Sequence, residues 1–343
     1  MIKVMVVDDS SFMRQLFKKT IEKNSKIEVI TTAGDGLDAI EKIKEYRPDV
    51  ITLDIDMPVK NGLETLKTIM KLNIPIPTIM VSAIDDKITV MKALELGAFD
   101  FIPKPSGSVS LSIDDIAENL TDKIIAAASM KGKPFCDIKP IIPYKDKISK
   151  KRTGSKYPII VIGTSSGGPK ALSALLPAFP ADLPAALLIV QHMPAGFTRS
   201  FARRLNQESS ITVKEAQEND RIKPGLALLA PGDFHMEVDK DGKIKLNQAE
   251  KKWSVRPSAD YTLISAAKNF QERVIGVILT GMGSDGSDGM KAIKKHGGYG
   301  LVEDRSTALV YGMPSSTIKN NAYDDIIPLH QIPFKIIELL ERR

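Results

Sequence analysis

Short apolar runs alternate with amphipathic helical patterns from the start of the chain to about residue 128. In the helical patterns, such as residues 12–22 and 36–46, apolar residues recur three and four positions apart. This alternation predicts an α/β domain with a doubly wound parallel sheet, which binds its ligands at the carboxyl ends of the strands. The runs that predict strands are residues 4–7, 28–32, 50–53, 79–82 and 99–102.

A second α/β series begins at residue 156. Apolar runs at residues 159–162, 186–191 and 274–280 are each followed by a turn and a helical pattern, and residues 226–230 predict one more strand. Residues 235–246 alternate around Asp241-Gly242, a pair typical of a β-hairpin. The pattern predicts a second doubly wound parallel sheet, in a Rossmann-like domain that also carries a β-hairpin.

In residues 129–155 the apolar residues follow neither the strand pattern nor the helical pattern. They contain Lys-Gly-Lys-Pro, further prolines and a basic run, a composition typical of a linker. The chain therefore divides into a domain over residues 1–128, a linker over residues 129–155 and a second domain over residues 156–343.

The length agrees with two globular domains, since a chain of 343 residues is too long to fold around one hydrophobic core in most proteins. The chain has 43% hydrophobic and 26% charged residues, and no apolar run is long enough to cross a membrane. The first strand pattern begins at once, so we expect no signal peptide. Cys136 is the single cysteine, which excludes an intrachain disulfide and favours a reducing compartment. We expect a cytoplasmic protein that is not embedded in a membrane.

The net charge of +6 comes from one segment. Residues 139–156 hold seven Lys or Arg and a single Asp, so the remainder of the chain is balanced. A basic run in a linker is typical of a solvated tether. We therefore expect no nucleic-acid partner.

Five polar residues follow the predicted strands of the first domain in order: Asp8 and Asp9, then Asp54, Ser82 and Lys104. Carboxylates that meet at one sheet edge repel each other, so a hard cation such as Mg²⁺ is expected there. With the cation bound, one carboxylate can attack phosphorus and form an aspartyl phosphate. Lys104 and Ser82 would contact the phosphoryl oxygens.

The motifs VVDDS, LDIDMP, VSA and FIPKP together resemble the receiver domain of two-component response regulators, a flavodoxin-like fold. The resemblance covers the whole first domain and implies Asp54 as the phosphoacceptor. It also implies Ser82 and Lys104 as a switch pair and Phe101 as an aromatic residue that reorients. The implied Mg²⁺ ligands are Asp8, Asp9, Asp54 and the main-chain carbonyl of Asp56.

The second domain opens with a strand pattern that leads into Gly163-Thr164-Ser165-Ser166-Gly167-Gly168-Pro169. This segment predicts a turn and then a helix that begins at Pro169. Ser165 would lie at the carboxyl end of the strand and the amino end of the helix, where a nucleophile meets free N–H groups. Gly163, Ser165 and Gly167 match the G-x-S-x-G elbow of serine hydrolases, although the turn alone fits a phosphate-binding loop equally well.

A serine nucleophile needs a base and an acid that orients it. Of four histidines, His192 alone ends a core strand, and Asp285 follows a third strand pattern. His296 is expected at a helix end, and His235 and His330 are expected to be structural or solvated. We therefore predict a Ser165, His192 and Asp285 triad at one sheet edge.

A dinucleotide-binding loop is the competing interpretation, because Gly281-x-Gly283-x-x-Gly286 is followed by Glu303 at a suitable distance. The acidic residues Asp285 and Asp288 oppose it, since a carboxylate at this position repels a pyrophosphate.

The motifs GTSSGGP, QHMPAGFTRSFARRL, APGDFHM, RPSAD and VILTGMGSDGSDGM resemble the methylesterase domain of the CheB family of chemotaxis response regulators. The resemblance implies hydrolysis of glutamate γ-methyl esters on methyl-accepting chemoreceptors, with methanol released, and deamidation of receptor glutamines. It implies a chemotaxis histidine kinase as phosphodonor, a place beside receptor clusters, and no cofactor for hydrolysis. Ser165, His192 and Asp285 match its triad.

The remaining site residues are predicted from turn geometry and motif. Backbone N–H groups near Ser166 and Met282 are expected to bind the oxyanion, and Arg256, in RPSAD, to contact the substrate. The alternative for the whole chain is a receiver domain joined to an effector domain that binds a partner without catalysis.

Overall fold

The structure is a computed structural model that describes residues 1–343 except 73–75, 84–85, 105–112, 131–140, 145–156 and 343, and omits the side chains of residues 113–118. The chain forms two compact units, Met1–Asp137 and Ile138–Arg343. Most of the predicted linker lies outside the described residues. Where it is described, the backbone N–H of Tyr144 donates to the carbonyl of Ala178 (3.1 Å) in the second unit.

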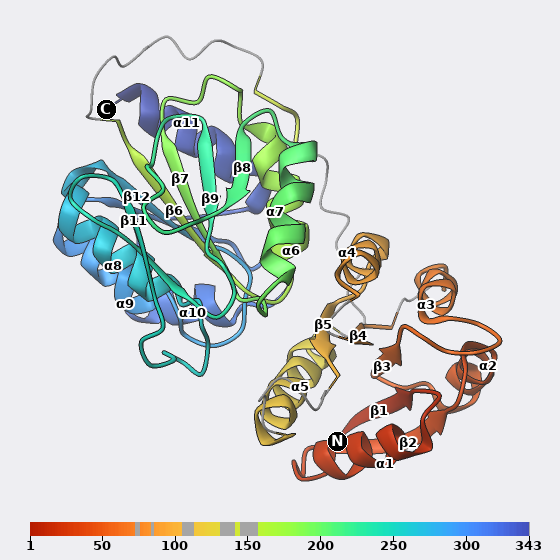
Figure 1. Ribbon diagram of the computed structural model, residues 1–343. Helices are drawn as coiled ribbons and strands as arrows, with labels where there is room; N and C mark the ends of the chain where they lie inside the picture. The colour runs from red at the N-terminus through yellow and green to blue at the C-terminus, as the bar shows by residue number, and fades with distance from the viewer. Residues whose placement is uncertain (73–75, 84–85, 105–112, 131–140, 145–156, 343) are drawn as a thin grey trace. The chain divides into compact units, whose positions relative to one another are not determined.

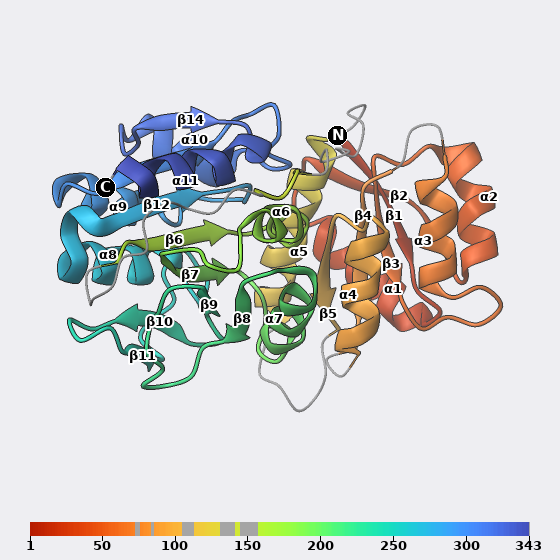
Figure 2. The same cartoon turned by 90° about the horizontal axis from the view of Figure 1, so that it is seen from above.

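The first unit is a parallel sheet with strand order β2-β1-β3-β4-β5 and helices on both faces. Helix α1 packs beside α5, while α2, α3 and α4 lie in a row (Figure 2). The predicted flavodoxin-like topology is confirmed. Its elements are β1 (Ile2–Val7), α1 (Ser11–Ile21), β2 (Ile27–Ala33), α2 (Gly36–Tyr46), β3 (Val50–Asp54), α3 (Gly62–Met70), β4 (Thr78–Ser82), α4 (Lys87–Leu96), β5 (Asp100–Pro103) and α5 (Ile113–Ala128).

The second unit contains a parallel sheet of seven strands in the order β14-β13-β12-β6-β7-β9-β8. Helices α8 and α9 lie on one side of the sheet, and α6 and α7 on the other (Figure 1). The strands are β6 (Ile159–Thr164), β7 (Ala186–Gln191), β8 (Thr212–Glu215), β9 (Leu226–Leu229), β12 (Val274–Ile278), β13 (Tyr299–Glu303) and β14 (Asp325–Ile327). The helices are α6 (Gly168–Leu175), α7 (Phe197–Glu208), α8 (Ala259–Phe270), α9 (Ser287–Lys295), α10 (Gly312–Lys319) and α11 (Ile332–Arg342).

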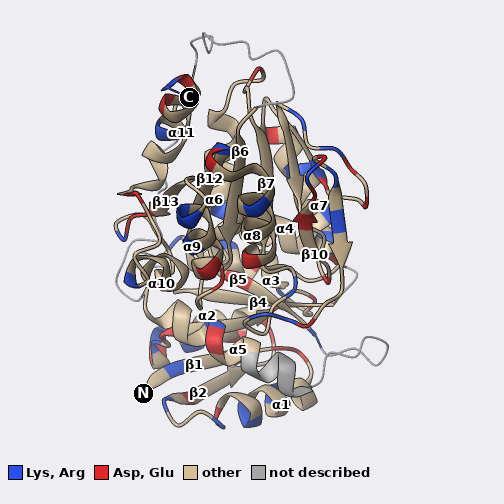
Figure 3. Ribbon diagram, turned by 90° about the vertical axis from the view of Figure 1, so that its left-hand side faces the viewer, with Lys and Arg blue, Asp and Glu red and all other residues tan. Residues whose placement is uncertain are grey.

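The central strands β6, β7 and β12 are completely buried and carry no charged side chain, as the uniform tan of these strands shows (Figure 3). Strands buried on both faces are expected to be continuous apolar runs, which is why the sequence predicts them clearly. The antiparallel hairpin β10 (His235–Val238) and β11 (Ile244–Asn247) is also where the sequence places it.

The strand order determines where the predicted site residues of the second unit lie. The chain enters the sheet at β6, proceeds to β7 on one side, and later returns at β12 on the other side of β6. Residues that follow these three strands therefore meet at one edge, at a topological switch point.

Candidate functional site

Three aspartates come together at the carboxyl ends of β1 and β3 in the first unit. Asp8 and Asp9 follow β1, and Asp54 ends β3, the strand paired with β1. One carboxylate oxygen from each residue lies within 4.8 Å of the other two. Oxygen ligands in such a cluster suit a hard divalent cation, so these residues fit the predicted Mg²⁺ site.

Lys104 lies against this cluster. Its Nζ is 2.7 Å from Asp54 Oδ2 and 3.3 Å from Asp8 Oδ2. Burial raises the pKa of Asp54 to about 6; the Lys104 ammonium opposes this effect and the neighbouring Asp8 adds to it. One ammonium does not balance three carboxylates, which leaves the cluster with negative charge for a cation.

The other predicted residues of this unit lie in or directly after β4 and β5. Ser82 is the last residue of β4, and its hydroxyl donates to the carbonyl of Ala83 (3.0 Å). Phe101, in β5, is buried, and Lys123 Nζ lies 5.7 Å from the centroid of its ring. The structure thus gathers Ser82, Lys104 and the aspartates at one sheet edge; their roles in phosphorylation stay predictions.

In the second unit, Ser165 occupies the turn between β6 and α6 and is half-buried. Its N–H donates to the carbonyl of Thr280 (3.1 Å), and its own carbonyl accepts from the N–H of Gly168 (2.8 Å). Gly167 adopts the left-handed region, with φ of 81°, where glycine is favoured. A Cβ on Gly281 would lie 2.9 Å from Ser165 Cβ, so the loop after β12 can pass close to Ser165 because residue 281 is glycine. The helix begins at Gly168, one residue before the prediction.

The predicted base and acid are in contact. His192 follows β7, and its Nε2 lies 2.7 Å from Asp285 Oδ2, in the loop after β12. A carboxylate can only accept, so Nε2 carries the hydrogen and Nδ1 retains a free lone pair. In the part of the chain that is described, no hydrogen bond joins Ser165 Oγ to the imidazole. Thr164 and Gln191 are the last paired residues of β6 and β7. Ser165 and His192, which follow them, therefore lie side by side at the carboxyl ends of these two strands.

Asp285 is held in a dry cradle, with only 1% of its surface exposed. Burial by itself would raise the pKa of Asp285, but hydrogen bonds from His192, Ser258 and the backbone hold it below its usual value. The aspartate is therefore an anion that orients the imidazole of His192. Its other donors are Ser258 Oγ (2.7 Å) and the backbone N–H groups of Ala259 (2.6 Å), Asp260 (3.1 Å) and Gly286 (3.0 Å).

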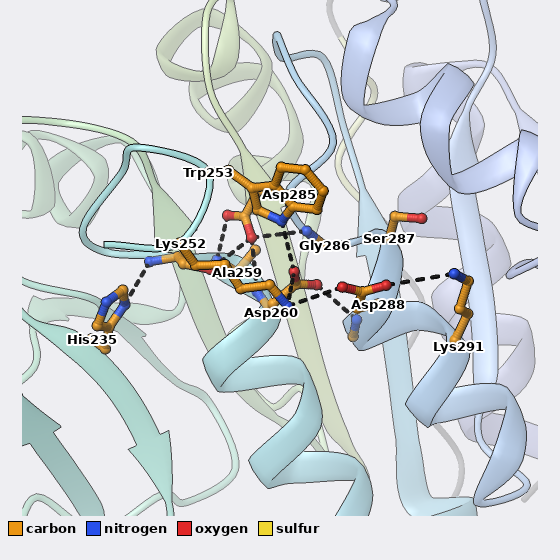
Figure 4. A network of polar contacts seen from close by, with 12 residues as sticks. His235, Lys252, Trp253, Ala259, Asp260, Asp285, Gly286, Ser287, Asp288 and Lys291 are labelled. Atoms are coloured by element: carbon orange, nitrogen blue, oxygen red, sulfur yellow. Dashed lines mark hydrogen bonds and ion pairs between the residues drawn. The ribbon is translucent and has the colours of Figure 1, made fainter. Parts of the chain in front are cut away.

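The sequence did not reveal this cradle, which comes from the amino end of α8. Ser258 is the N-cap of that helix, and the next two residues supply N–H groups that have no partner within the helix. Asp260 also accepts from the indole of Trp253 (3.1 Å) and pairs with Lys252 (2.8 Å), which fastens the preceding loop (Figure 4). RPSAD was visible as a motif, but its contact with Asp285 depends on tertiary packing.

His235 contacts the residues at the start of α8 that bind Asp285. Its buried ring stacks on Tyr261 with centroids 3.9 Å apart, and its Nδ1 accepts from the N–H of Ser258 (3.2 Å). Burial lowers the pKa of His235, which favours the neutral ring that this bond requires. The prediction of a structural or solvated His235 is confirmed as structural, while His330 is exposed and His296 ends α9.

The three residues predicted for the oxyanion and substrate have different surroundings. Ser166 is buried, and its carbonyl accepts from Thr280 Oγ1 (2.9 Å). Met282 is half-buried, and its N–H makes no hydrogen bond to any residue that the structure describes. The Arg256 guanidinium donates to Asp233 (2.7 Å) and to two loop carbonyls, so it fastens loops together. Its contact with substrate stays a prediction.

The dinucleotide interpretation does not fit the structure. Asp285 occupies the loop and accepts from the N–H of Gly286, a donor that a pyrophosphate would need. Glu303, the expected ribose ligand, is fully buried and accepts from the N–H of Thr280 (2.7 Å). Neither residue is available to a nucleotide.

Two family models match the chain. Residues 160–336 match the model described as CheB methylesterase, and residues 4–113 match the response regulator receiver domain. No helix among the described residues has the length and apolar character needed to cross a membrane.

Curated relatives match over the whole length. A protein-glutamate methylesterase/protein-glutamine glutaminase of Pyrococcus horikoshii is 44% identical over 99% of this chain and 94% of that protein. The protein of the same name from Thermotoga maritima is 44% identical over 99% of this chain and 98% of that protein. The crystal structure of the Thermotoga maritima CheB methylesterase catalytic domain is similar with a TM-score of 0.53 and 44% identity, covering 54% of this chain and all of that one.

Proposed function

Because the chain belongs to the CheB methylesterase family and carries a receiver domain at its amino end, we propose that it is a phosphorylation-regulated protein-glutamate methylesterase and protein-glutamine glutaminase. Its substrates are methyl-accepting chemoreceptors: it hydrolyses glutamate γ-methyl esters, releases methanol, and deamidates receptor glutamines. The observation that carries the proposal is the His192–Asp285 pair, 2.7 Å apart in a dry cradle beside Ser165.

The hydrolysis follows from the ring orientation. With the Nε2 hydrogen bound to Asp285, Nδ1 of His192 takes the proton of Ser165 Oγ as the serine attacks the ester carbonyl. The tetrahedral intermediate collapses when His192 returns this proton to the methoxide, and methanol leaves. A water molecule, deprotonated by the same nitrogen, then cleaves the glutamyl–serine ester. Asp285 stabilises the imidazolium that forms in both steps.

The oxyanion of each intermediate needs hydrogen-bond donors at the mouth of the turn. Two observations support the N–H of Met282 as one of these donors: the residue is half-buried, and its N–H makes no hydrogen bond to a described residue. The N–H of Ser166 is the second donor in this proposal, since it follows the nucleophile on the turn. Hydrolysis uses no cofactor.

Regulation is assigned to the first unit, where Asp54 is the phosphoacceptor and a chemotaxis histidine kinase is the phosphodonor. Asp8, Asp9, Asp54 and the carbonyl of Asp56 would hold Mg²⁺, which when bound neutralises phosphoryl oxygens during transfer. Lys104, at 2.7 Å from Asp54, would pair with the phosphoryl group, and Ser82 would donate to it. Phe101 then adjusts to the new arrangement of the β4 and β5 ends.

In this proposal the protein is cytoplasmic, lies peripheral to receptor clusters and has no nucleic-acid partner. The domains in this proposal are the receiver over residues 1–128, the linker over residues 129–155 and the catalytic domain over residues 156–343.

The test is methanol release from receptor membranes that carry labelled methyl esters, with and without a small phosphodonor and Mg²⁺. We expect release by the full chain, faster after phosphorylation, and none by Ser165→Ala. A wild-type chain that binds these membranes but releases no methanol would instead support the partner-binding effector without catalysis.

A further inference from the structure

Gln191 is the last residue of β7 and stands directly before the base. Only 2% of its surface is exposed. Its carboxamide nitrogen, Nε2, lies 3.0 Å from the carbonyl oxygen of Ser165 and 3.1 Å from the carbonyl oxygen of His192. One amide group therefore gives its two hydrogens to the backbone of the nucleophile and to the backbone of the base.

The other contacts of these two residues attach each of them to a neighbouring strand end. The N–H of Ser165 donates to Thr280, and the N–H of His192 donates to the carbonyl of Thr164 (3.1 Å). Since Ser165 Oγ has no hydrogen bond to the imidazole in the described chain, that bond does not set their spacing. Among the described side chains, Gln191 is the one that hydrogen-bonds to the backbone of both Ser165 and His192.

The orientation of the amide follows from its surroundings. With oxygen and nitrogen exchanged, a carbonyl oxygen would face two further carbonyl oxygens at about hydrogen-bond distance, which is repulsive. On the other side, a Cβ on Gly168 would lie 2.1 Å from Oε1, so the backbone of the turn passes directly against the amide. The side chain is thus fixed both by its two acceptors and by the first residue of α6.

We propose that Gln191 is a positioning residue for hydrolysis, which sets the spacing of Ser165 and His192 by bonding to both backbones. This inference rests on the proposed function. The amide hydrogen-bonds to backbone carbonyls and not to Ser165 Oγ or the His192 ring, so its effect is on geometry, to which rates respond steeply.

The test compares the wild type with Gln191→Glu, which keeps the size of the side chain and replaces the donor by an oxygen. We expect kcat for methanol release to fall by roughly 10- to 100-fold, with KM for the receptor unchanged, because misplacing reacting groups by about 1 Å costs rate and not binding. Gln191→Met removes the donor without adding charge and should also lose kcat. Near-UV circular dichroism checks that both variants are folded.

Asn269→Asp is the matched control, because its amide also donates to a backbone carbonyl, that of Val238 (2.9 Å), away from the triad. It should keep wild-type kcat. Folded Gln191→Glu and Gln191→Met with wild-type kcat would overturn the inference, as would two variants that both fail to fold, since the role would then be stability. Absence of methanol release by the wild type and by Asn269→Asp would overturn the proposed function itself.

Discussion

Glu303 offers a sharp test of the electrostatics of the second unit. The side chain ends β13, is fully buried, and accepts from the N–H of Thr280 through Oε2, while Oε1 accepts no hydrogen bond from a described residue. Burial raises the pKa of Glu303 from 4.5 to about 7; the N–H of Thr280 and the hydroxyl of Thr307 oppose the rise, and the nearby Asp304 adds to it. The folded chain therefore favours the protonated acid.

The sign and size of the effect on stability follow from this pKa. A carboxyl group whose pKa is higher in the folded state costs nothing below pH 4.5, where both states are protonated. The cost grows as pH rises and levels off above pH 7, the folded pKa. A rise from 4.5 to about 7 corresponds to about 3 kcal/mol of unfolding free energy at 1.36 kcal/mol per pKa unit.

Glu303→Gln should remove this cost and keep the acceptor for Thr280. We expect the variant and the wild type to unfold alike near pH 4, and the variant to be more stable by about 3 kcal/mol at pH 8. Urea unfolding followed by tryptophan fluorescence measures this directly, because the single tryptophan, Trp253, lies in the same unit. Glu250→Gln, at an exposed position, is the control and should show no such trend.

A difference that stays constant from pH 4 to pH 8 would refute the reasoning, and so would a variant less stable than the wild type at pH 8. Either result would mean that Glu303 is ionised when folded and stabilised by a partner.

The remaining predictions concern catalysis and its control. His192→Ala should lower methanol release by about 10³-fold or more if the triad acts as a unit, whereas His330→Ala, at an exposed site, should remain active. Asp285→Asn should lower kcat by roughly 10⁴-fold by favouring the wrong tautomer, and calorimetry should detect no NAD(H) binding before or after the change. His235→Ala leaves the buried N–H of Ser258 without its acceptor and should cost about 1–3 kcal/mol in thermal or urea unfolding. Asp54→Asn should keep the basal rate but lose the acceleration by phosphodonor, and chelation of Mg²⁺ should have the same effect on the wild type; acceleration that survives either treatment would contradict the assigned phosphosite.

The central strands of both units could be predicted because burial on two faces makes them continuous apolar runs. Strands β8, β13 and β14 were not predicted. β8 and β14 are edge strands of four and three residues with partly exposed side chains, and β13 begins after two glycines, so none carries a long apolar run.

The position of Ser165, His192 and Asp285 at one sheet edge could be predicted because parallel strands bring their carboxyl ends together, while their roles as a triad stay a prediction. The residues that hydrogen-bond to Asp285 and to the backbone of Ser165 and His192 could not be predicted. Ser258 Oγ donates to Asp285 and Gln191 Nε2 donates to two backbone carbonyls, and these hydrogen bonds depend on how α8 and β7 pack. Residue spacing also cannot predict that Nε2 of His192, and not Nδ1, contacts Asp285, because this depends on the orientation of the ring in the folded protein.

The placement of the site on β6, β7 and β12 has a consequence for biosynthesis. His192 and Asp285 are 93 residues apart in the chain, and the cradle at the start of α8 lies between them in sequence. A ribosome must therefore synthesise most of the second unit before His192 can contact Asp285, and a truncated product that ends before β12 lacks Asp285. If the proposed mechanism holds, esterase activity reports completed synthesis, and we expect its recovery on refolding to require the long-range pairing of β12 with β6.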